Sequence, residues 1–126
     1  MIRAKEHSRI AVLGASPKED RYSFKAVKLL KEYGFLPIPV HPAGHVVDGQ
    51  VSVRSLDDIT EPVDTLTMYV GAEISDKELE KILRLKPRRV IFNPGAENEA
   101  IAEKIEAAGI EVVRACTLVM LRSDQF

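Results

Sequence analysis

Short apolar runs alternate along this chain with longer stretches in which apolar residues recur every three or four positions. The short runs predict strands buried on both faces of a sheet, because such strands lose the polar alternation of half-exposed ones. We expect five of them, at residues 9–13, 35–40, 65–70, 89–92 and 110–113. The longer stretches have the periodicity of amphipathic helices.

The first helix is predicted over residues 23–33, after the loop that follows the first strand. Its apolar residues fall on one helical face, namely Ala26, Leu29, Leu30 and Tyr33. Ser23 is the expected N-cap, because its hydroxyl can accept a hydrogen bond from a first-turn amide. Gly34 stands where a left-handed residue after a helix belongs.

The second helix is predicted from a capping box. Ser75 and Glu78 have the spacing of this motif, and Pro87 ends the helical region. The remaining elements are short or weakly marked: a helix over residues 97–108, a hairpin over 46–53 and one helical turn over 56–59. The pattern assigns no element beyond Arg114.

Strands that alternate with helices favour a parallel sheet covered on both faces. We therefore predict an α/β fold, a Rossmann-like three-layer sandwich with a mostly parallel sheet of about five strands. Residues 1–126 are expected to form a single domain, since this length suits one core. Pro37 and Pro39 lack N–H donors, so the second strand is expected to be an edge strand, irregular, or bonded mainly through its carbonyls.

Composition and charge narrow the range of functions. The chain is 45% hydrophobic and 29% charged, with a formal net charge of −1, as is typical of an ordinary soluble domain. This charge gives no bulk attraction to nucleic acid. No apolar run approaches the roughly 20 residues that span a bilayer, and the first residues show no apolar signal core. We expect a cytoplasmic protein without a membrane or nucleic-acid partner.

The loop after the first strand is the leading candidate for a ligand site. Parallel sheets bind ligands beyond the carboxyl ends of their strands, where the strand order switches. Gly14 begins this loop and allows the backbone to approach a phosphate closely. The amides that open the next helix favour an anion, and the Arg21 guanidinium can grip a phosphate with two hydrogen bonds. The alternative is that Gly14 only makes a tight turn.

The loop differs from that of a dinucleotide-binding domain. No second glycine follows Gly14 before Gly34. The second strand ends in His41-Pro42, where such domains place an acid for the ribose hydroxyls. His41 and His45 suit an additional phosphate, such as those of coenzyme A (CoA) or NADP. The alternative is that both histidines are surface residues without a ligand.

No catalytic or metal-binding set stands out in the sequence. The three histidines lack ligand spacing, and Cys116 has no cysteine partner for a disulfide or a zinc site. Cys116 is either an activated nucleophile or a small buried hydrophobe, and the second interpretation is favoured. We predict neither catalytic residues nor a metal site.

Several short motifs occur in a fixed order between residues 9 and 116. They are residues 12–17, Arg21-Tyr22-Ser23, Pro39-Val40-His41-Pro42, residues 93–99, residues 107–113 and Cys116. In this order and spacing they resemble the CoA-binding protein family typified by the bacterial YccU-like proteins. That family is similar to the N-terminal CoA-binding domain of the succinyl-CoA synthetase alpha subunit. The chain departs from the usual family residues at His41, at Asn93-Pro94 and at Arg114-Ala115.

The resemblance implies a Rossmann-like fold with CoA lying across the carboxyl ends of the strands. The residues implied to face the CoA phosphates are Gly14, Ala15, Ser16, Arg21, Tyr22 and Ser23. His41 and Pro42 are implied to lie near the adenosine. Val70, Gly71 and Ala72 are implied to line the pantetheine path, and the residues implied to lie beside it are Asn93, Pro94, Gly95 and Ala96. The synthetase's phosphohistidine lies in a further domain, so this chain is not expected to carry a synthetase reaction.

The leading prediction is that the chain binds coenzyme A or an acyl-CoA through the first strand–helix loop, without catalysis by this chain alone. One alternative is an NAD(P)-binding redox or regulatory protein, and another is a CoA-ligase module that needs a partner chain. A regulatory interaction protein with a vestigial ligand site is a further alternative. A homodimer or a complex with a partner protein stays open, because the sequence has no interface signature.

Overall fold

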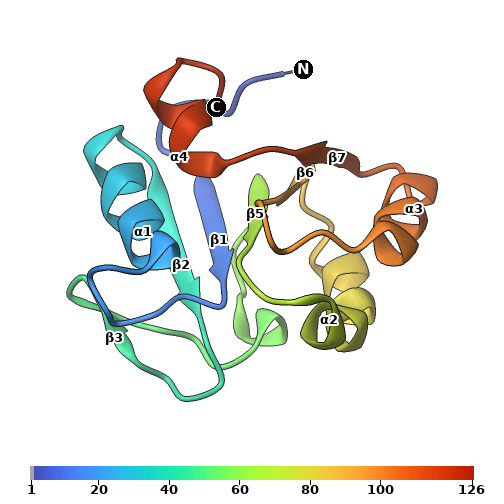
Figure 1. Cartoon of the computed structure of the whole chain (residues 1–126), viewed down its shortest axis with the longest axis horizontal. Helices are drawn as coiled ribbons and strands as arrows, with labels where there is room; N and C mark the ends of the chain where they lie inside the picture. The colour runs from blue at the N-terminus through green and yellow to red at the C-terminus, as the bar shows by residue number, and fades with distance from the viewer. Residues whose placement is uncertain (1) are drawn as a thin grey trace.

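The computed structural model describes residues 2–126 and contains one five-stranded sheet (Figure 1). Its strands are β1 (Arg9–Leu13), β2 (Leu36–Val40), β5 (Thr65–Met68), β6 (Arg89–Phe92) and β7 (Glu111–Arg114). The order across the sheet is β2-β1-β5-β6-β7, and every neighbouring pair is parallel. Two short strands, β3 (Val46–Val47) and β4 (Gln50–Val51), form the predicted hairpin separately. The predicted α/β architecture is confirmed.

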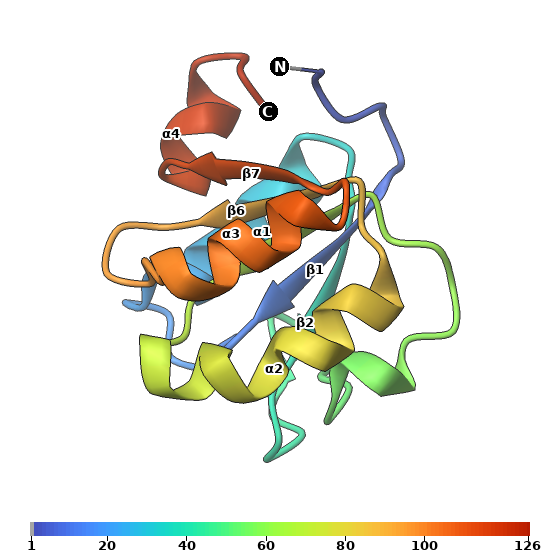
Figure 2. The same ribbon diagram turned by 90° about the vertical axis from the view of Figure 1, so that its right-hand side faces the viewer.

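Helices cover both faces of the sheet, as Figures 1 and 2 show. One face carries α1 (Tyr22–Glu32) and α4 (Thr117–Arg122), and the other carries α2 (Ala72–Leu85) and α3 (Glu99–Ala107). A 3-10 turn, η1 (Leu56–Asp58), packs beside α2. Among residues 2–126, none of these helices combines the length and the apolar character needed to cross a bilayer.

The alternation of side chains along β1 explains why two separate cores form. Ile10 and Val12 are fully buried against α1 and α4, whereas Ala11 and Leu13 are buried against the α2 and α3 side. Successive side chains of a strand point to opposite faces, so an all-apolar strand supplies both cores at once. This is the physical basis of the short apolar runs in the sequence.

The chain reverses direction across the sheet between β1 and β5. From β1 it passes through α1 to β2 at the edge, and it then returns to the other side of β1 to form β5. Strands β6 and β7 continue outward from β5. In open parallel sheets such a reversal leaves a crevice at the carboxyl ends of the two strands. The loop at Gly14 therefore opens into this crevice.

The prolines of β2 lie on an edge strand, as the sequence predicts. The outer side of β2 is bonded through its carbonyls, since the Val53 amide donates to the Pro39 carbonyl oxygen at 3.0 Å. Val53 forms an isolated bridge with Val40 and no further strand follows. Pro39 therefore needs no N–H donor on this side.

Two of the predicted helix starts are wrong. Helix α1 begins at Tyr22 rather than at Ser23. Helix α2 begins at Ala72, so Ser75 lies inside its first turn and no capping box forms. The buried Ser75 hydroxyl instead donates to the Ala72 carbonyl and accepts from the Asn98 side-chain amide at 2.9 Å. This tertiary contact outweighs the local capping preference.

The predicted start of the third helix is wrong in the other direction, because α3 begins later than predicted, at Glu99. Asn98 is its N-cap, because the Asn98 side-chain oxygen accepts from the Ile101 amide at 3.4 Å. The Asn98 amide group also donates to Asp76 at 2.7 Å. A single buried asparagine thus joins the amino ends of α2 and α3.

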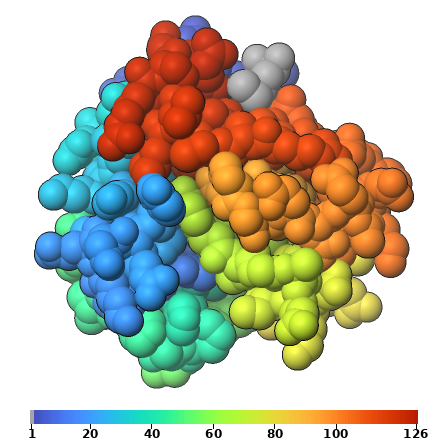
Figure 3. All heavy atoms as spheres, viewed as in Figure 1, coloured from blue at the N-terminus to red at the C-terminus, as the bar shows by residue number. Residues whose placement is uncertain are grey.

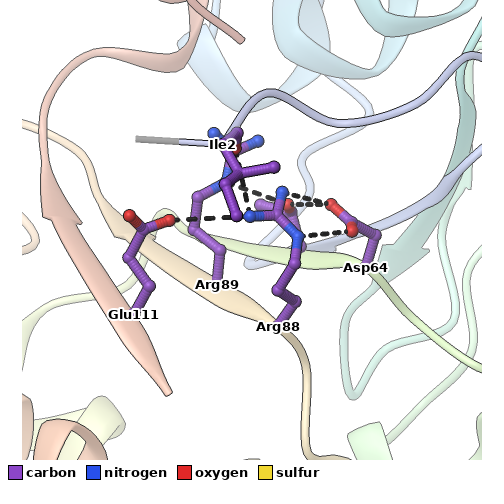
Figure 4. Close-up of polar contacts among 6 residues, drawn as sticks. Ile2, Asp64, Arg88, Arg89 and Glu111 are labelled. Carbon is purple, nitrogen blue, oxygen red and sulfur yellow. Dashed lines mark hydrogen bonds and ion pairs between the residues drawn. The ribbon is translucent and has the colours of Figure 1, made fainter. Parts of the chain in front are cut away.

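An ion pair fastens the amino-terminal edge of the sheet (Figure 4). The Arg88 guanidinium donates to both carboxylate oxygens of Asp64, at 2.8 and 3.1 Å, and to the Ile2 carbonyl at 3.0 Å. Glu111 lies 3.6 Å from the same guanidinium. Burial acts to raise the pKa of Asp64, but hydrogen bonds from Arg88 and Thr65 outweigh it and hold that pKa below its ordinary value.

Asp64→Asn is expected to lower the free energy of unfolding by about 1–2 kcal/mol at pH 7, because it weakens two charge-assisted hydrogen bonds. A carboxyl with a depressed pKa stabilises the fold above its unfolded pKa, near pH 4, and this contribution is lost as the pH falls through the folded pKa. Urea unfolding of both proteins at pH 7 and at about pH 3 measures the difference. A difference of equal size at both pH values would contradict this explanation.

Candidate functional site

Two adjoining hollows lie at the carboxyl ends of the strands, on the face seen in Figure 3. The first hollow encloses about 310 Å³ and is lined by Gly14, Ser16, Lys18, Arg21, Tyr22, Ser23 and Tyr69. The second hollow encloses about 360 Å³ and is lined by Tyr22, Tyr69, Asn93, Pro94, Cys116, Leu118, Val119 and Arg122. Because Tyr22 and Tyr69 belong to both, the two hollows form one path along this edge.

Gly14 has no room for a side chain. A Cβ atom built there would lie 2.7 Å from Val70 Cγ1 and 2.8 Å from the Tyr69 carbonyl oxygen. Its φ of +88° is also a conformation that L side chains rarely adopt. Only glycine therefore lets the chain turn out of β1 this close to the end of β5.

The loop after Gly14 is held open by two serines. The Ser23 hydroxyl accepts from the Ser16 amide at 3.0 Å, and the Ser16 hydroxyl accepts from the Lys18 amide at 3.1 Å. These bonds pin the loop to the start of α1 without filling the hollow. Ser23, predicted as a helix cap, thus organises the loop instead.

The amino end of α1 lies at the first hollow, and its first turn contains no acidic residue. Arg21 is the N-cap residue, and its side chain makes no capping hydrogen bond. The first-turn amides of a helix without such a cap favour an anion, and the helix dipole adds to that preference. Lys18 and Arg21 line the same hollow, and neither forms an ion pair with any residue from 2 to 126. The arrangement is suited to a phosphate.

Among the residues implied to face the CoA phosphates, Ala15 alone turns away from the hollow. Its side chain is fully buried in the core beneath α1. Its amide donates to the Val40 carbonyl at 3.3 Å, as does the Gly14 amide at 2.9 Å. Ala15 therefore shapes the loop from behind.

Tyr69 is a site residue that the sequence analysis missed, because it was placed within a strand. Its ring lines both hollows. The hydroxyl is shielded from solvent and makes no well-formed hydrogen bond with the described residues. Burial is the main cause that raises the pKa of Tyr69 to about 12, while weaker polar contacts with Thr117 and Thr67 oppose the rise. The phenol is thus a neutral donor at physiological pH.

Asn93 lines the second hollow, but its side-chain amide is occupied by the protein. Its NH₂ group donates to the Thr67 hydroxyl at 2.7 Å and to the Met68 carbonyl at 2.8 Å. Its oxygen accepts from the Thr117 amide at 2.8 Å. The residue ties β5, β6 and α4 together and fixes the wall of the hollow, which is a different role from the ligand contact expected of it.

The other residues predicted along the pantetheine path are spread around the two hollows. Pro94 lines the second hollow. Val70 packs against Gly14, and Gly71 is the N-cap of α2. The Gly95 amide donates to the Glu97 carboxylate at 2.8 Å. Val70, Gly71 and Gly95 line neither hollow.

His41 and Pro42 lie at the same edge of the sheet, after β2, but outside both hollows. The His41 ring lies tilted against the His45 ring, with 4.5 Å between centroids, and its Nδ1 accepts from the Ala43 amide at 3.0 Å. Burial, and then the charge of His45, lower the pKa of His41. Arg54 donates to the Pro42 carbonyl at 2.8 Å.

Helix α4 supplies the wall that the sequence did not predict. Leu118, Val119 and Arg122 recur at helical spacing on one side of α4 and line the second hollow. Cys116 precedes the helix and lines the same hollow. Within residues 2–126, no cluster of three or more His, Cys, Asp or Glu side chains could hold a metal ion. The chemistry of this edge is therefore that of hydrogen bonds, cationic side chains and apolar contact.

A larger hollow of about 680 Å³ lies near both chain ends, lined by Arg3, Ala4, Tyr33, Phe35, Leu121, Asp124 and Phe126. Arg3 and Ala4 precede β1, and Phe35 precedes β2, so this hollow lies at the amino ends of the strands. It has no glycine turn and no helix amino end. Ligands of open parallel sheets bind at the opposite edge.

Comparisons with known proteins agree with this fold over most of the chain. A family model described as "CoA binding domain" matches residues 8–122. The uncharacterized protein YneT of Bacillus subtilis is 29% identical over 105 residues, which are 83% of this chain and 78% of that protein.

Solved structures are similar over nearly the whole chain. One crystal structure of an uncharacterized protein is 40% identical, with a TM-score of 0.91 over 97% of this chain and 100% of that one. The cell-free ID.343 protein from Thermus thermophilus is 31% identical, with a TM-score of 0.85 over 95% of this chain and 91% of that one. A dinucleotide forming acetyl-coenzyme A synthetase 1 of Ca. Korarchaeum cryptofilum shares the fold at 18% identity and a TM-score of 0.73, over 87% of this chain and 26% of that one.

Proposed function

Because the chain belongs to the family of CoA-binding domains, we propose that it binds coenzyme A or an acyl-CoA through the loop between β1 and α1. The cradle at Gly14 carries the proposal. There the backbone turns where no Cβ atom fits, beside a helix amino end and two cationic side chains without ion-pair partners among residues 2–126. Family membership supplies the ligand class, and this geometry suits the CoA pyrophosphate.

The first hollow would hold the pyrophosphate. The amides at the start of α1 would donate to its oxygens, and Arg21 and Lys18 would balance its charge. The adenosine would lie toward His41 and Pro42, where Arg54 offers a cation for the 3′-phosphate. The Arg54 guanidinium donates one N–H to the Pro42 carbonyl, which holds it at the end of β2.

The second hollow would take the pantetheine and its thiol. Tyr69 and Tyr22 stand between the two hollows, and Pro94, Leu118 and Val119 give the second one apolar walls. Apolar walls suit the methylene groups of pantetheine. The Tyr69 ring would add aromatic contact, while its shielded hydroxyl lies near Thr67 and Thr117.

The proposed role is binding without catalysis by this chain alone. The residues that line the two hollows supply cations, hydroxyls and apolar side chains, which suit the binding of a ligand. The synthetase from Ca. Korarchaeum cryptofilum carries a domain of this fold as about a quarter of its length. We propose that the present chain holds its ligand for a partner protein, from a single cytoplasmic domain.

The test is calorimetric titration of the purified chain with CoA, acetyl-CoA, NAD and NADP. Saturable binding of the CoA species, with NAD and NADP at least about tenfold weaker, would support the proposal. Preference for NAD or NADP would favour a redox or regulatory protein. Binding of none of the four would favour an interaction protein. Dephospho-CoA, which lacks the 3′-phosphate, tests the adenosine end separately.

Arg21→Gln is expected to weaken CoA binding by about 1–3 kcal/mol, because it removes a charge-assisted hydrogen bond to the pyrophosphate. The same titration measures the loss. Arg84→Gln is the matched control, since Arg84 pairs with Asp57 away from both hollows. Equal affinities of the Arg21→Gln protein and the wild type would remove Arg21 from the site.

A further inference from the structure

Eight of the nine arginines of this chain fall into two groups by their partners. The ninth, Arg89, is buried at the start of β6, where it donates to the Thr65 hydroxyl. Those paired with a carboxylate are Arg3, Arg9, Arg84, Arg88 and Arg114. Arg21, Arg54 and Arg122 form no ion pair with residues 2–126. All three unpaired guanidinium groups lie along the edge of the sheet that carries the proposed CoA site: Arg21 at the first hollow, Arg54 beside Pro42, and Arg122 at the second hollow.

CoA itself carries an anionic group for two of these three cations. The pyrophosphate accounts for Arg21, and the 3′-phosphate accounts for Arg54. The third does not, because the pantetheine arm and the thiol carry no charge at neutral pH. Arg122 nevertheless stands at the hollow proposed for that arm. An anion there must come from whatever the thiol carries.

The second hollow combines apolar walls with one cationic side chain, that of Arg122. Tyr69, Pro94, Leu118 and Val119 supply apolar contact, and the space is about 360 Å³. Arg122 follows Leu118 by one helical turn on α4, and both residues line the same hollow. A guanidinium binds a carboxylate through two parallel hydrogen bonds.

We propose that the ligand is a CoA thioester of a short dicarboxylic acid, whose free carboxylate binds Arg122. The pantetheine arm would enter the second hollow past Tyr22, Tyr69 and Pro94, and the acyl methylene groups would lie beyond it against Leu118 and Val119. The pyrophosphate would stay at the first hollow. This inference rests on the proposed function and adds the class of acyl group. A basic residue near the end of α4 also interacts favourably with the helix dipole. Either lysine or arginine would provide that interaction, so Arg122→Lys distinguishes it from the binding of a carboxylate by two hydrogen bonds.

The experiment compares thioesters of equal length that differ only in the terminal carboxylate. The pairs are malonyl- and propionyl-CoA, succinyl- and butyryl-CoA, and glutaryl- and valeryl-CoA. For at least one pair the wild-type protein is expected to bind the dicarboxylic member about tenfold or more tightly. In Arg122→Gln this preference should fall to within about twofold, while the affinity for free CoA stays within about twofold.

Two further variants make the result specific. Arg122→Lys should retain part of the preference, since it keeps the charge and loses the paired geometry. Arg84→Gln, remote from the site, should retain all of it. Equal affinity within every pair for the wild type, or a preference that survives Arg122→Gln, would overturn this inference and leave the proposed function standing. Failure of every CoA species to bind would overturn the proposed function itself, and this inference with it.

Discussion

Gly14→Ala is expected to lower the free energy of unfolding by about 3 kcal/mol and to weaken CoA binding by at least about tenfold. Two costs add. The left-handed backbone at φ +88° disfavours an L side chain by roughly 1–2 kcal/mol. The new methyl group would also sit 2.7 Å from Val70 and 2.8 Å from the Tyr69 carbonyl, and forcing such contacts costs about 1–3 kcal/mol. If the loop shifted to relieve these contacts, the space for the phosphate beside Gly14 would be lost, which is why CoA binding should weaken.

Gly109→Ala separates the two costs. Gly109 has a similar φ of +86°, but no atom lies within 4 Å of its Cβ position, and it follows α3 away from the hollows. The Gly109→Ala protein should lose only the backbone part of the free energy of unfolding, roughly 1–2 kcal/mol, and should keep its affinity for CoA. Urea unfolding and calorimetry measure both quantities. Equal losses of stability in the two variants would show that the close contact of Gly14 with Tyr69 and Val70 does not contribute to the cost of Gly14→Ala.

The central part of the fold follows from the sequence because it rests on local physics. An all-apolar strand such as β1 must be buried on both faces, and the alternation of Ile10 and Val12 with Ala11 and Leu13 supplies both cores. Prolines in β2 restrict it to an edge. These constraints need no knowledge of distant partners, and they were enough to predict the sheet.

The helix starts were mispredicted where distant residues compete with local signals. Ser75 has the spacing of a cap, but a contact with Asn98, 23 residues later, takes its hydroxyl. Ser23 bonds back to the Ser16 amide and holds the loop. A sequence motif predicts the hydrogen bonds that a side chain can make with neighbouring residues in the chain. It does not predict competition from a distant residue that only the fold brings into contact.

The candidate site divides in the same way. The first hollow is built largely from one continuous loop, so the sequence identified Gly14, Ser16 and Arg21. Tyr69 and Arg122 enter only because β5 pairs with β1 and because the tail folds into α4. An aromatic residue at the carboxyl end of a strand was the one available signal for Tyr69.

Asn93→Ala is expected to cost about 3 kcal/mol of stability while leaving the CoA affinity of the folded protein within about threefold. The Met68 carbonyl and the Thr117 amide lose their partner, and each unsatisfied buried group costs roughly 1–3 kcal/mol. Both N–H groups of the Asn93 amide donate within the protein, so no donor of this side chain is left for a ligand. A large loss of affinity at unchanged stability would instead assign Asn93 to the ligand.

Asn93→Asp sharpens this test through its pH dependence. The new carboxyl would be buried and would face the Met68 carbonyl oxygen, so its pKa should rise above the unfolded value of about 4. A raised pKa means that stability is present below the unfolded pKa and is lost as the pH rises toward the folded one. The free energy of unfolding of this variant should therefore be closest to that of the wild type in acid and should fall below it as the pH rises, whereas the loss in Asn93→Ala should not change over that range.

That trend is opposite in sign to the one expected at Asp64, where the native carboxylate is stabilised by Arg88. Parallel pH profiles for the two Asn93 variants would show that the amide's donation to Met68 is not what holds β5, β6 and α4 together.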